Sequence, residues 1–260
     1  MIHSTAIIDS KAKIFENVKI GPYCVIGPNV EVGNDTVIQA HVNISGNTII
    51  GKGNNFYPFA SIGNDPQDLK YNGEETKLII GNKNTIREYV TINTGTVGGG
   101  GKTKVGDNCL FMISSRIADD CNVGNNVVIA NNVPLGGHAR IGDGVIIGGN
   151  SAVQQFTRIG KMAMIGGMTG VLNDVIPYGL SIGNRNYLQG LNLIGLRRKD
   201  LPNKEILSLS EAYKEIFKTE KLTDNLSKLN GLFKKNSLVN DVIEFINEDK
   251  KRPICTPFSK

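Results

Sequence analysis

Polar residues of a catalytic type recur at one fixed spacing in the middle of the chain. Asp119 and Gly137 are 18 residues apart, and so are Asp120 and His138. Gln155 follows Gly137 at the same interval. If 18 residues complete one turn of a coil, all five stack along one edge, where two carboxylates and an imidazole are equipped for general acid–base catalysis. The plainer alternative is a hydrated corner with Asp residues in turns.

A six-residue apolar repeat predicts the coil that this spacing requires. Aliphatic or aromatic residues occupy every sixth position from Ile2 to Ile62, from Ile80 to Ile92 and from Val105 to Val171. This period fits neither an α-helix nor strands joined by hairpins, and it is typical of a hexapeptide parallel β-helix. Three such hexads make one triangular coil of 18 residues, with successive coils roughly 4.8 Å apart through parallel strand pairing.

The predicted fold is an all-β left-handed parallel β-helix over residues 1–190, followed by a small α-helical domain over residues 191–260. Breaks in the hexads predict inserted loops at 63–79 and 93–104, and loops that interrupt a rigid scaffold tend to carry function. Residues 172–190 are expected to form an irregular transition. In the tail we expect an extended terminus from Pro253 to Lys260 and three helices, namely one over 203–217, one capped by Thr223 or Asp224 with Leu226, Leu229 and Leu232 on one face, and one containing Val239, Val242, Ile243 and Ile246.

Charge and cysteine content narrow the function classes. The net charge is +5, and the tail from Arg197 to Lys260 contributes +4 of it, with 14 Lys and Arg against 10 Asp and Glu. This favours an acidic protein partner over nucleic acid, because no aromatic platform accompanies the charge. The four cysteines lack metal-type spacing and indicate reduced thiols of a cytoplasmic protein. We expect neither a signal peptide nor stable membrane insertion, since no apolar run has the length of a membrane span.

Two familiar motifs are excluded because the chain lacks residues or elements that they require. The glycine-rich stretch Gly98–Thr103 lacks the preceding glycine and the following helix of a phosphate-binding loop, so we expect a flexible external loop. A zinc site of three converging imidazoles would need three neighbouring histidines. His3, His41 and His138 occupy unrelated coil positions. We therefore expect no metal and no cofactor.

Several further stretches resemble one family. They are Gln67-Asp68-Leu69-Lys70-Tyr71 in the first loop, Ile129–Asn132, Gly137-His138, Ile147–Gly149, Gln155-Phe156, and the segment Asn192–Arg198 with Gly195-Leu196-Arg197-Arg198. With the hexads, both loops and the helical tail, these stretches make the chain similar to the acyl-[acyl-carrier-protein]–UDP-N-acetylglucosamine O-acyltransferases that begin lipid A synthesis.

The resemblance implies a reaction and an assembly. A 3-hydroxyacyl group would pass from acyl carrier protein to the 3-position of the UDP-sugar, in a homotrimer with sites between neighbouring prisms. The basic tail would face the acidic carrier protein. The residues to which the resemblance assigns roles are Asp68, Lys70, His138 and Gln155 for substrate contact, Asn192 and Arg198 for the uridine and diphosphate, the Gly137 N–H as oxyanion donor, and Met164, Gly167 and Met168 at the end of the acyl chain.

One departure from the family pattern affects the catalytic base. The family has His-x-x-His-Asp-Cys where this chain has Arg116-Ile117-Ala118-Asp119-Asp120-Cys121, so Asp119 stands where the family has its general base. A carboxylate is a weaker base than an imidazole by about 2.6 pKa units, which raises the barrier by on the order of 2 kcal/mol. Three hypotheses remain: an O-acyltransferase with Asp119 or His138 as base, an N-acyltransferase on a 3-amino sugar, and a catalytically impaired binding protein.

Overall fold

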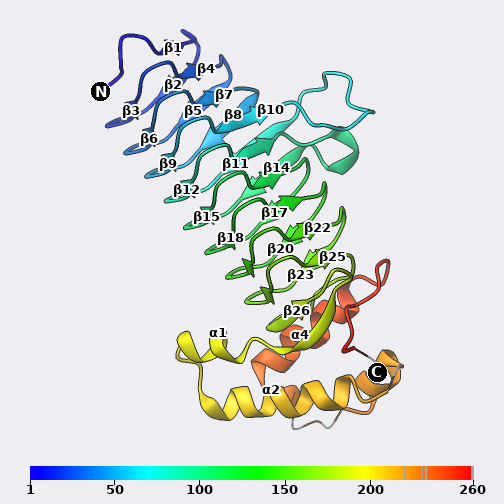
Figure 1. The fold of residues 1–260 in the computed structure, drawn as a ribbon. Coiled ribbons are helices and arrows are strands. Elements are labelled where there is room, and N and C mark those ends of the chain that lie inside the picture. The colour runs from blue at the N-terminus through cyan, green and yellow to red at the C-terminus, as the bar shows by residue number, and fades with distance from the viewer. Residues whose placement is uncertain (220, 230, 232, 259–260) are drawn as a thin grey trace.

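The computed structural model describes residues 1–219, 221–229, 231 and 233–258. It is a three-walled prism with a helical domain at its C-terminal end (Figure 1). The first wall is a nine-stranded sheet of β1 (Ile7–Ile8), β4 (Val25–Ile26), β7 (Asn43–Ile44), β10 (Ser61–Asn64), β13 (Thr91–Asn93), β16 (Arg116–Ile117), β19 (Pro134–Leu135), β22 (Ala152–Val153) and β25 (Gly170–Val171).

The other two walls complete the triangle within this described chain. The second wall contains β2 (Lys13–Ile14), β5 (Val30–Val32), β8 (Asn47–Ile50), β11 (Lys77–Ile80), β14 (Lys102–Val105), β17 (Asn122–Val123), β20 (Arg140–Ile141) and β23 (Arg158–Ile159). The third wall contains β3 (Lys19–Ile20), β6 (Val37–Ile38), β9 (Asn55–Phe56), β12 (Thr85–Ile86), β15 (Leu110–Phe111), β18 (Val128–Ile129), β21 (Ile146–Ile147), β24 (Met164–Ile165), β26 (Gly179–Ile182) and β27 (Tyr187–Leu191). The predicted left-handed parallel β-helix is confirmed.

The repeated aliphatic residues face inward and set the register. In the first wall Ile117 pairs with Leu135, and Leu135 pairs with Val153, through parallel strands. All three side chains are buried. Because most strands are only two residues long, a tight corner follows each of them. Corner residues such as Asp120 and His138 take left-handed backbone angles, with φ of 56° and 61°. Asn and Asp accept this conformation more readily than most residues.

The two loops interrupt neighbouring coils and contact each other. The first connects β10 to β11, and the second connects β13 to β14 through a 3₁₀ helix, η1 (Val97–Gly99). The side-chain amide of Asn93 donates a 2.7 Å hydrogen bond to the carbonyl of Asp65. The stretch expected to be a flexible external loop, Gly98–Thr103, contains the end of η1 and the start of β14. Its flexibility stays a prediction.

Beyond the hexads, the segment expected to be irregular forms a hairpin. Strands β26 and β27 pair antiparallel. The hairpin was not predicted because its bulge and its turn follow no six-residue pattern. The helices are α1 (Leu193–Arg198), α2 (Asn203–Ile216), α3 (Leu222–Ser227) and α4 (Ser237–Glu248), with a 3₁₀ helix η2 (Phe233–Lys235).

Two details of the tail differ from expectation or lie beyond the described residues. Helix α3 begins at Leu222 after Lys221, with no side-chain cap, rather than at Thr223 or Asp224. Leu232 and residues 259–260 are outside the described chain. Ile254 and Pro257 form isolated parallel bridges with Asp174 and Leu188, so this part of the tail is extended as predicted.

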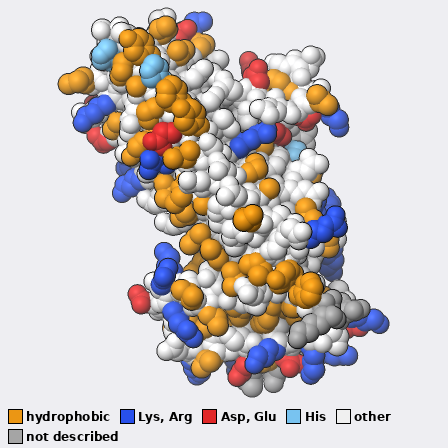
Figure 2. All heavy atoms as spheres, in the orientation of Figure 1, with side chains coloured by type: hydrophobic (Ala, Val, Ile, Leu, Met, Phe, Trp, Pro, Cys, Tyr) orange, Lys and Arg blue, Asp and Glu red, His pale blue; other side chains and the backbone are white. Residues whose placement is uncertain are grey.

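Lys and Arg side chains gather around the helical domain (Figure 2). No described helix is long and apolar enough to cross a membrane.

A buried arginine joins the helical domain to the prism. Nε of Arg158, on β23, donates a 2.7 Å hydrogen bond to the Asp174 carboxylate. Its Nη atoms donate to the carbonyls of Phe245 and Asp249 and to Glu248. The Arg158 and Asp174 side chains are 4% and 1% exposed. Because the pair is desolvated, loss of Arg158 leaves the buried Asp174 carboxylate with a single charged partner, Arg252, whose Nε is 4.0 Å away.

We therefore predict that Arg158→Met lowers the free energy of unfolding by about 3–5 kcal/mol. The control is Lys13→Ala, which breaks the exposed Lys13–Glu31 pair and should cost less than about 1 kcal/mol. Urea unfolding at one fixed protein concentration measures both. Equal losses for the two variants would contradict the assigned role of Arg158.

Candidate functional site

The residues predicted to stack on one edge lie together in a cleft. This cleft, of about 770 Å³, runs along the first wall where coils turn into the second wall. The lining residues that the sequence singled out are Asp68, Lys70, Asp119, Gly137, His138 and Gln155. Arg116, Leu69 and Phe156 also line the cleft. One chain thus brings both loop residues and all the predicted catalytic side chains except Asp120 to a common space.

Asp119 presents a buried carboxylate to this cleft. The residue is 7% exposed, and its side chain accepts no hydrogen bond from any described residue. Its carbonyl accepts the His138 N–H at 2.9 Å, which holds the two coils in register. A Cβ atom on Gly137 would lie 2.8 Å from Asp119 Oδ2. Glycine at position 137 therefore makes room for the carboxylate.

Asp120 lies beside Asp119 but is held by the second loop. Thr96 donates its N–H to Oδ1 at 2.9 Å and its hydroxyl to Oδ2 at 2.5 Å. The Asp120 N–H donates to the Thr103 hydroxyl at 2.9 Å. The Asp120 side chain is fully buried. These contacts fix the orientation of the carboxylate.

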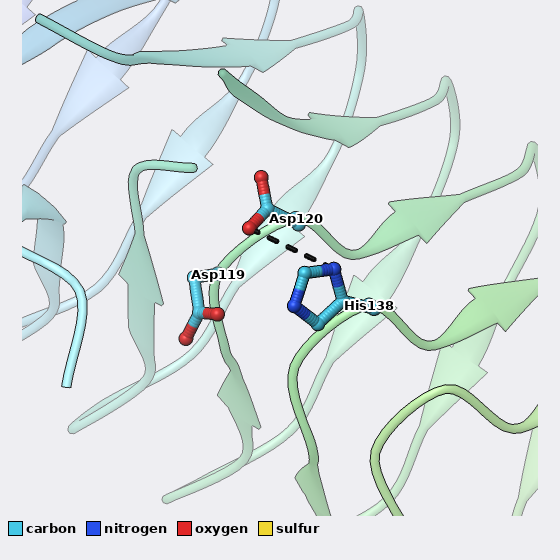
Figure 3. Close-up of side chains that lie close together, drawn as sticks. All are labelled: Asp119, Asp120 and His138. Atoms are coloured by element: carbon cyan, nitrogen blue, oxygen red, sulfur yellow. Dashed lines mark ion pairs between the residues drawn. The ribbon is translucent and has the colours of Figure 1, made fainter. Parts of the chain in front are cut away.

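His138 lies on the coil that follows Asp120, as the 18-residue spacing predicts. Its Nδ1 is 3.8 Å from Asp120 Oδ2, which is too long for a hydrogen bond. The imidazole stacks on Phe156 with ring centroids 4.3 Å apart. In Figure 3 a dashed line joins the Asp120 carboxylate to the His138 ring, and the Asp119 side chain lies next to both. The prediction that Asp120 and His138 are neighbours is confirmed.

The backbone at Gly137 offers a hydrogen-bond donor to the cleft. Its carbonyl accepts the Phe156 N–H at 2.9 Å, whereas its own N–H donates to no atom of the described residues. An unpaired N–H next to a carboxylate and an imidazole can stabilise an oxyanion that forms during acyl transfer.

The first loop covers one side of the cleft. The Lys70 N–H donates to Asp68 Oδ1 at 2.9 Å, and the Tyr71 hydroxyl donates to the Glu74 carbonyl at 3.2 Å. Leu69 is fully exposed. These local bonds leave the Lys70 ammonium with no ion-pair partner among the described residues, so it remains available to an anion.

Other predicted residues lie in a second groove. Met164, Asn192 and Arg198 line an apolar groove on the third wall, and it shares no residue with the cleft. Asn192 caps α1, accepting the Gly195 N–H at 3.1 Å, and donates to the Met162 carbonyl. Gly167 and Met168 are exposed at the corner between β24 and β25. A single chain therefore does not unite all the predicted residues.

Sequence analysis did not identify Thr96 and Thr103 as site residues. Their contacts with Asp120 cross an insertion that shifts the repeat, so the 18-residue rule does not align them. The signal that could have found them is the pair of threonines flanking the glycine run.

Three side chains near the cleft could together hold a metal ion. Asp119, Asp120 and His138 each offer one ligand atom, and these atoms lie within 4.8 Å of one another.

The contact between the second loop and Asp120 predicts different effects for two adjacent glycines. A Cβ on Gly99 would lie 2.0 Å from the Asp120 carboxylate, whereas a Cβ on Gly98 meets nothing within 4 Å. Gly99→Ala should lower the free energy of unfolding by about 1–3 kcal/mol through overpacking, and Gly98→Ala by less than about 0.5 kcal/mol. Denaturant unfolding compares them. Matching values would show that the loop does not pack on Asp120.

Comparison with known proteins places the chain. A family model described as UDP N-acetylglucosamine O-acyltransferase, domain 2, matches residues 174–255, and a bacterial transferase hexapeptide model matches residues 11–46. The chain is 49% identical over 255 residues to the acyl-[acyl-carrier-protein]–UDP-N-acetylglucosamine O-acyltransferase of Rickettsia canadensis (98% of this chain, 97% of the relative). It is 43% identical to that of Rhizobium johnstonii (98% and 94%). The crystal structure of UDP-N-acetylglucosamine O-acyltransferase from Moraxella catarrhalis superposes with a TM-score of 0.94 at 46% identity (97% and 98%). The chain therefore belongs to the UDP-N-acetylglucosamine O-acyltransferase family.

Proposed function

We propose that this chain transfers a 3-hydroxyacyl group from acyl carrier protein to the 3-hydroxyl of UDP-N-acetylglucosamine, the first step of lipid A synthesis. Family membership supports the reaction. The observation that carries it in this chain is the juxtaposition, in one cleft, of the Asp119 carboxylate, the His138 ring and the unpaired Gly137 N–H. A base and an oxyanion donor are the two groups that acyl transfer to a hydroxyl requires.

The catalytic set consists of Asp119, Asp120, Gly137 and His138. Asp119 removes the proton of the sugar hydroxyl as its oxygen attacks the thioester carbon. The Gly137 N–H stabilises the oxyanion, and the departing thiolate recovers the proton. His138 contacts the acceptor sugar, and Asp120 faces its Nδ1. Asp119 suits the role of base because its carboxylate is unpaired and lines the cleft.

The remaining residues bind the substrates. Asp68, Lys70 and Gln155 line the cleft around the acceptor sugar. Asn192 and Arg198 contact the uridine and diphosphate, for which a guanidinium is well suited. The end of the acyl chain lies near Met164, Gly167 and Met168. A Cβ on Gly167 would lie 3.3 Å from the Gly149 carbonyl, so a larger residue there would narrow this space.

The two grooves support a homotrimer. The cleft lies on the first wall and the groove with Asn192 and Arg198 lies on the third wall, so one chain holds half of each site. A closed threefold arrangement brings the first wall of one chain against the third wall of the next and unites the halves. The basic helical domain receives the acidic carrier protein. All four cysteines are buried and free, in keeping with a reducing, cytoplasmic setting.

A comparison of two acceptor sugars tests which atom of the sugar is acylated. The purified protein is assayed with a 3-hydroxyacyl carrier protein and either UDP-N-acetylglucosamine or its 3-amino analogue, whose neutral nucleophile needs less help from a base. We expect O-acylation. Exclusive N-acylation would identify an amino-sugar enzyme, and nucleotide-sugar binding without turnover would indicate a binding protein.

Substitution of Asp119 tests its role directly. We predict that Asp119→Ala lowers kcat at least tenfold, since general-base catalysis typically contributes about 10²–10⁴-fold. Asp119→His should exceed the wild type by more than about tenfold, because imidazole is the stronger base. An undiminished rate in Asp119→Ala would remove this residue from the mechanism.

Mixed trimers test the shared site. His138→Ala inactivates the cleft and Arg198→Ala inactivates the groove, so each homotrimer should be nearly inactive. Co-expression in equal amounts should restore roughly a quarter of wild-type activity, because one interface in four then joins an intact cleft to an intact groove. Activity that stays at the level of the single variants would place both halves of the site in one chain.

A further inference from the structure

Two carboxylates and an imidazole from successive coils meet at one corner of the prism. Asp119 and Asp120 are adjacent, and His138 lies on the next coil toward the C-terminal end (Figure 3). We propose that Asp119, Asp120 and His138 bind one divalent transition-metal cation, of the Mn²⁺, Co²⁺ or Zn²⁺ class. From the sequence we expect no metal, on the ground that three neighbouring histidines are lacking, and the proposed site departs from that expectation with a cluster of different composition.

Unbalanced buried charge is the first argument. Asp119 is 7% exposed and the Asp120 side chain is fully buried. Among the described residues, no Lys or Arg nitrogen lies within 4.0 Å of either carboxylate, and the nearest ring nitrogen is His138 Nδ1 at 3.8 Å. Buried charges in proteins are paired or coordinate metals. Two neighbouring carboxylates therefore call for a cation between them.

Asp119 is an independent indication of a ligand. Its neighbour Asp120 already accepts two hydrogen bonds from Thr96. Asp119 is more than nine-tenths buried, has no partner among the described side chains, and faces the cleft. A carboxylate with no partner in such a place is costly unless something bound in the cleft satisfies it.

The distances suit a shared ion. Two ligands roughly 2.1 Å from one cation lie about 3.0–4.2 Å apart, depending on the angle between them. The separation of 3.8 Å between His138 Nδ1 and Asp120 Oδ2 falls in this range and exceeds a hydrogen bond. The three ligand atoms lie within 4.8 Å of one another.

The surroundings orient the ligands in the way that metal sites require. Thr96 fixes the Asp120 carboxylate with two hydrogen bonds, and Phe156 stacks on the His138 ring. Gly99 and Gly137 leave the space that the two carboxylates occupy. Such outer contacts hold ligands in place and affect metal affinity strongly.

The ligand set selects the kind of ion. Two oxygens and one imidazole nitrogen favour Mn²⁺, Co²⁺ or Zn²⁺ over Mg²⁺ and Ca²⁺, which prefer oxygen alone. Three protein ligands also leave at least one coordination position for a water or a substrate oxygen, as catalytic sites do. Of the three ligands, Asp119 and His138 line the cleft together with Gly137 and Lys70.

The role of the ion rests on the proposed function. A hydroxyl oxygen bound to the cation becomes more acidic, so the weakly basic carboxylate suffices. One Asp119 oxygen binds the ion and the other takes the hydroxyl proton. The sugar oxygen then bonds to the thioester carbon, the carbon–sulfur bond breaks, and the thiolate takes the proton from Asp119. The ion thereby compensates for a carboxylate at the base position.

Direct binding measurements test the site. Protein freed of metal with a chelator is titrated with Co²⁺, followed by d–d absorption, and with Mn²⁺ and Zn²⁺ by calorimetry. We expect one ion per chain. Asp119→Asn, Asp120→Asn and His138→Gln, which preserve side-chain size, should each weaken binding at least about tenfold. His41→Gln and Asp143→Asn, a histidine and an aspartate outside the cluster, are the controls and should bind as the wild type does. No binding, or equal binding by all variants, overturns the proposal.

Activity measured in parallel separates this proposal from the proposed function. Chelation that stops acylation, with recovery on adding back the ion, supports the metal role. Acylation by metal-free protein that binds no ion overturns the metal site and leaves the acyltransferase intact. Stoichiometric binding without acylation of either acceptor supports the site and contradicts the activity. Circular dichroism of each variant confirms that the fold is retained.

Discussion

Direct stacking of one coil on the next is the constraint on which this molecule depends. The aliphatic residues of each wall fill the interior, and parallel pairing holds successive coils one strand spacing apart. Any corner residue is then forced close to the residue one coil away, whatever their side chains. The contact between Asp120 and His138 is therefore a product of the backbone register, and the chemistry depends only on which residue types occupy the corner.

The same constraint explains why the cleft and the groove lie on different faces. A rigid triangular prism cannot fold its first wall onto its third wall, so the cleft with Asp119 and the groove with Arg198 stay apart within a chain. The inserted loops supply what straight walls lack. One brings Lys70 over the cleft, and the other brings Thr96 onto Asp120. Regular coils provide precise positions, and the two irregular insertions provide enclosure and orientation.

Sequence analysis predicted the features that obey the repeat. The buried column of Ile117, Leu135 and Val153 and the meeting of Asp120 with His138 follow from counting residues. Helix α4 followed from its apolar spacing. The hairpin of β26 and β27 was missed because its residues have no six-residue period, and the hydrogen bond from Thr96 to Asp120 was missed because the insertion changes the count. Contacts across a phase shift are set by three-dimensional packing, which a linear pattern does not contain.

The antiparallel strand β27 has a consequence for how these prisms behave in crowded solution. A stack of parallel coils ends in unpaired backbone groups that can template another copy, end to end, into a fibre. Here the chain reverses at its last coil, and the bridge from Leu188 to Pro257 lays the C-terminal segment alongside, where proline offers no donor. At this end of the third wall the strand edge is thus covered by the chain's own tail and not left open to another copy.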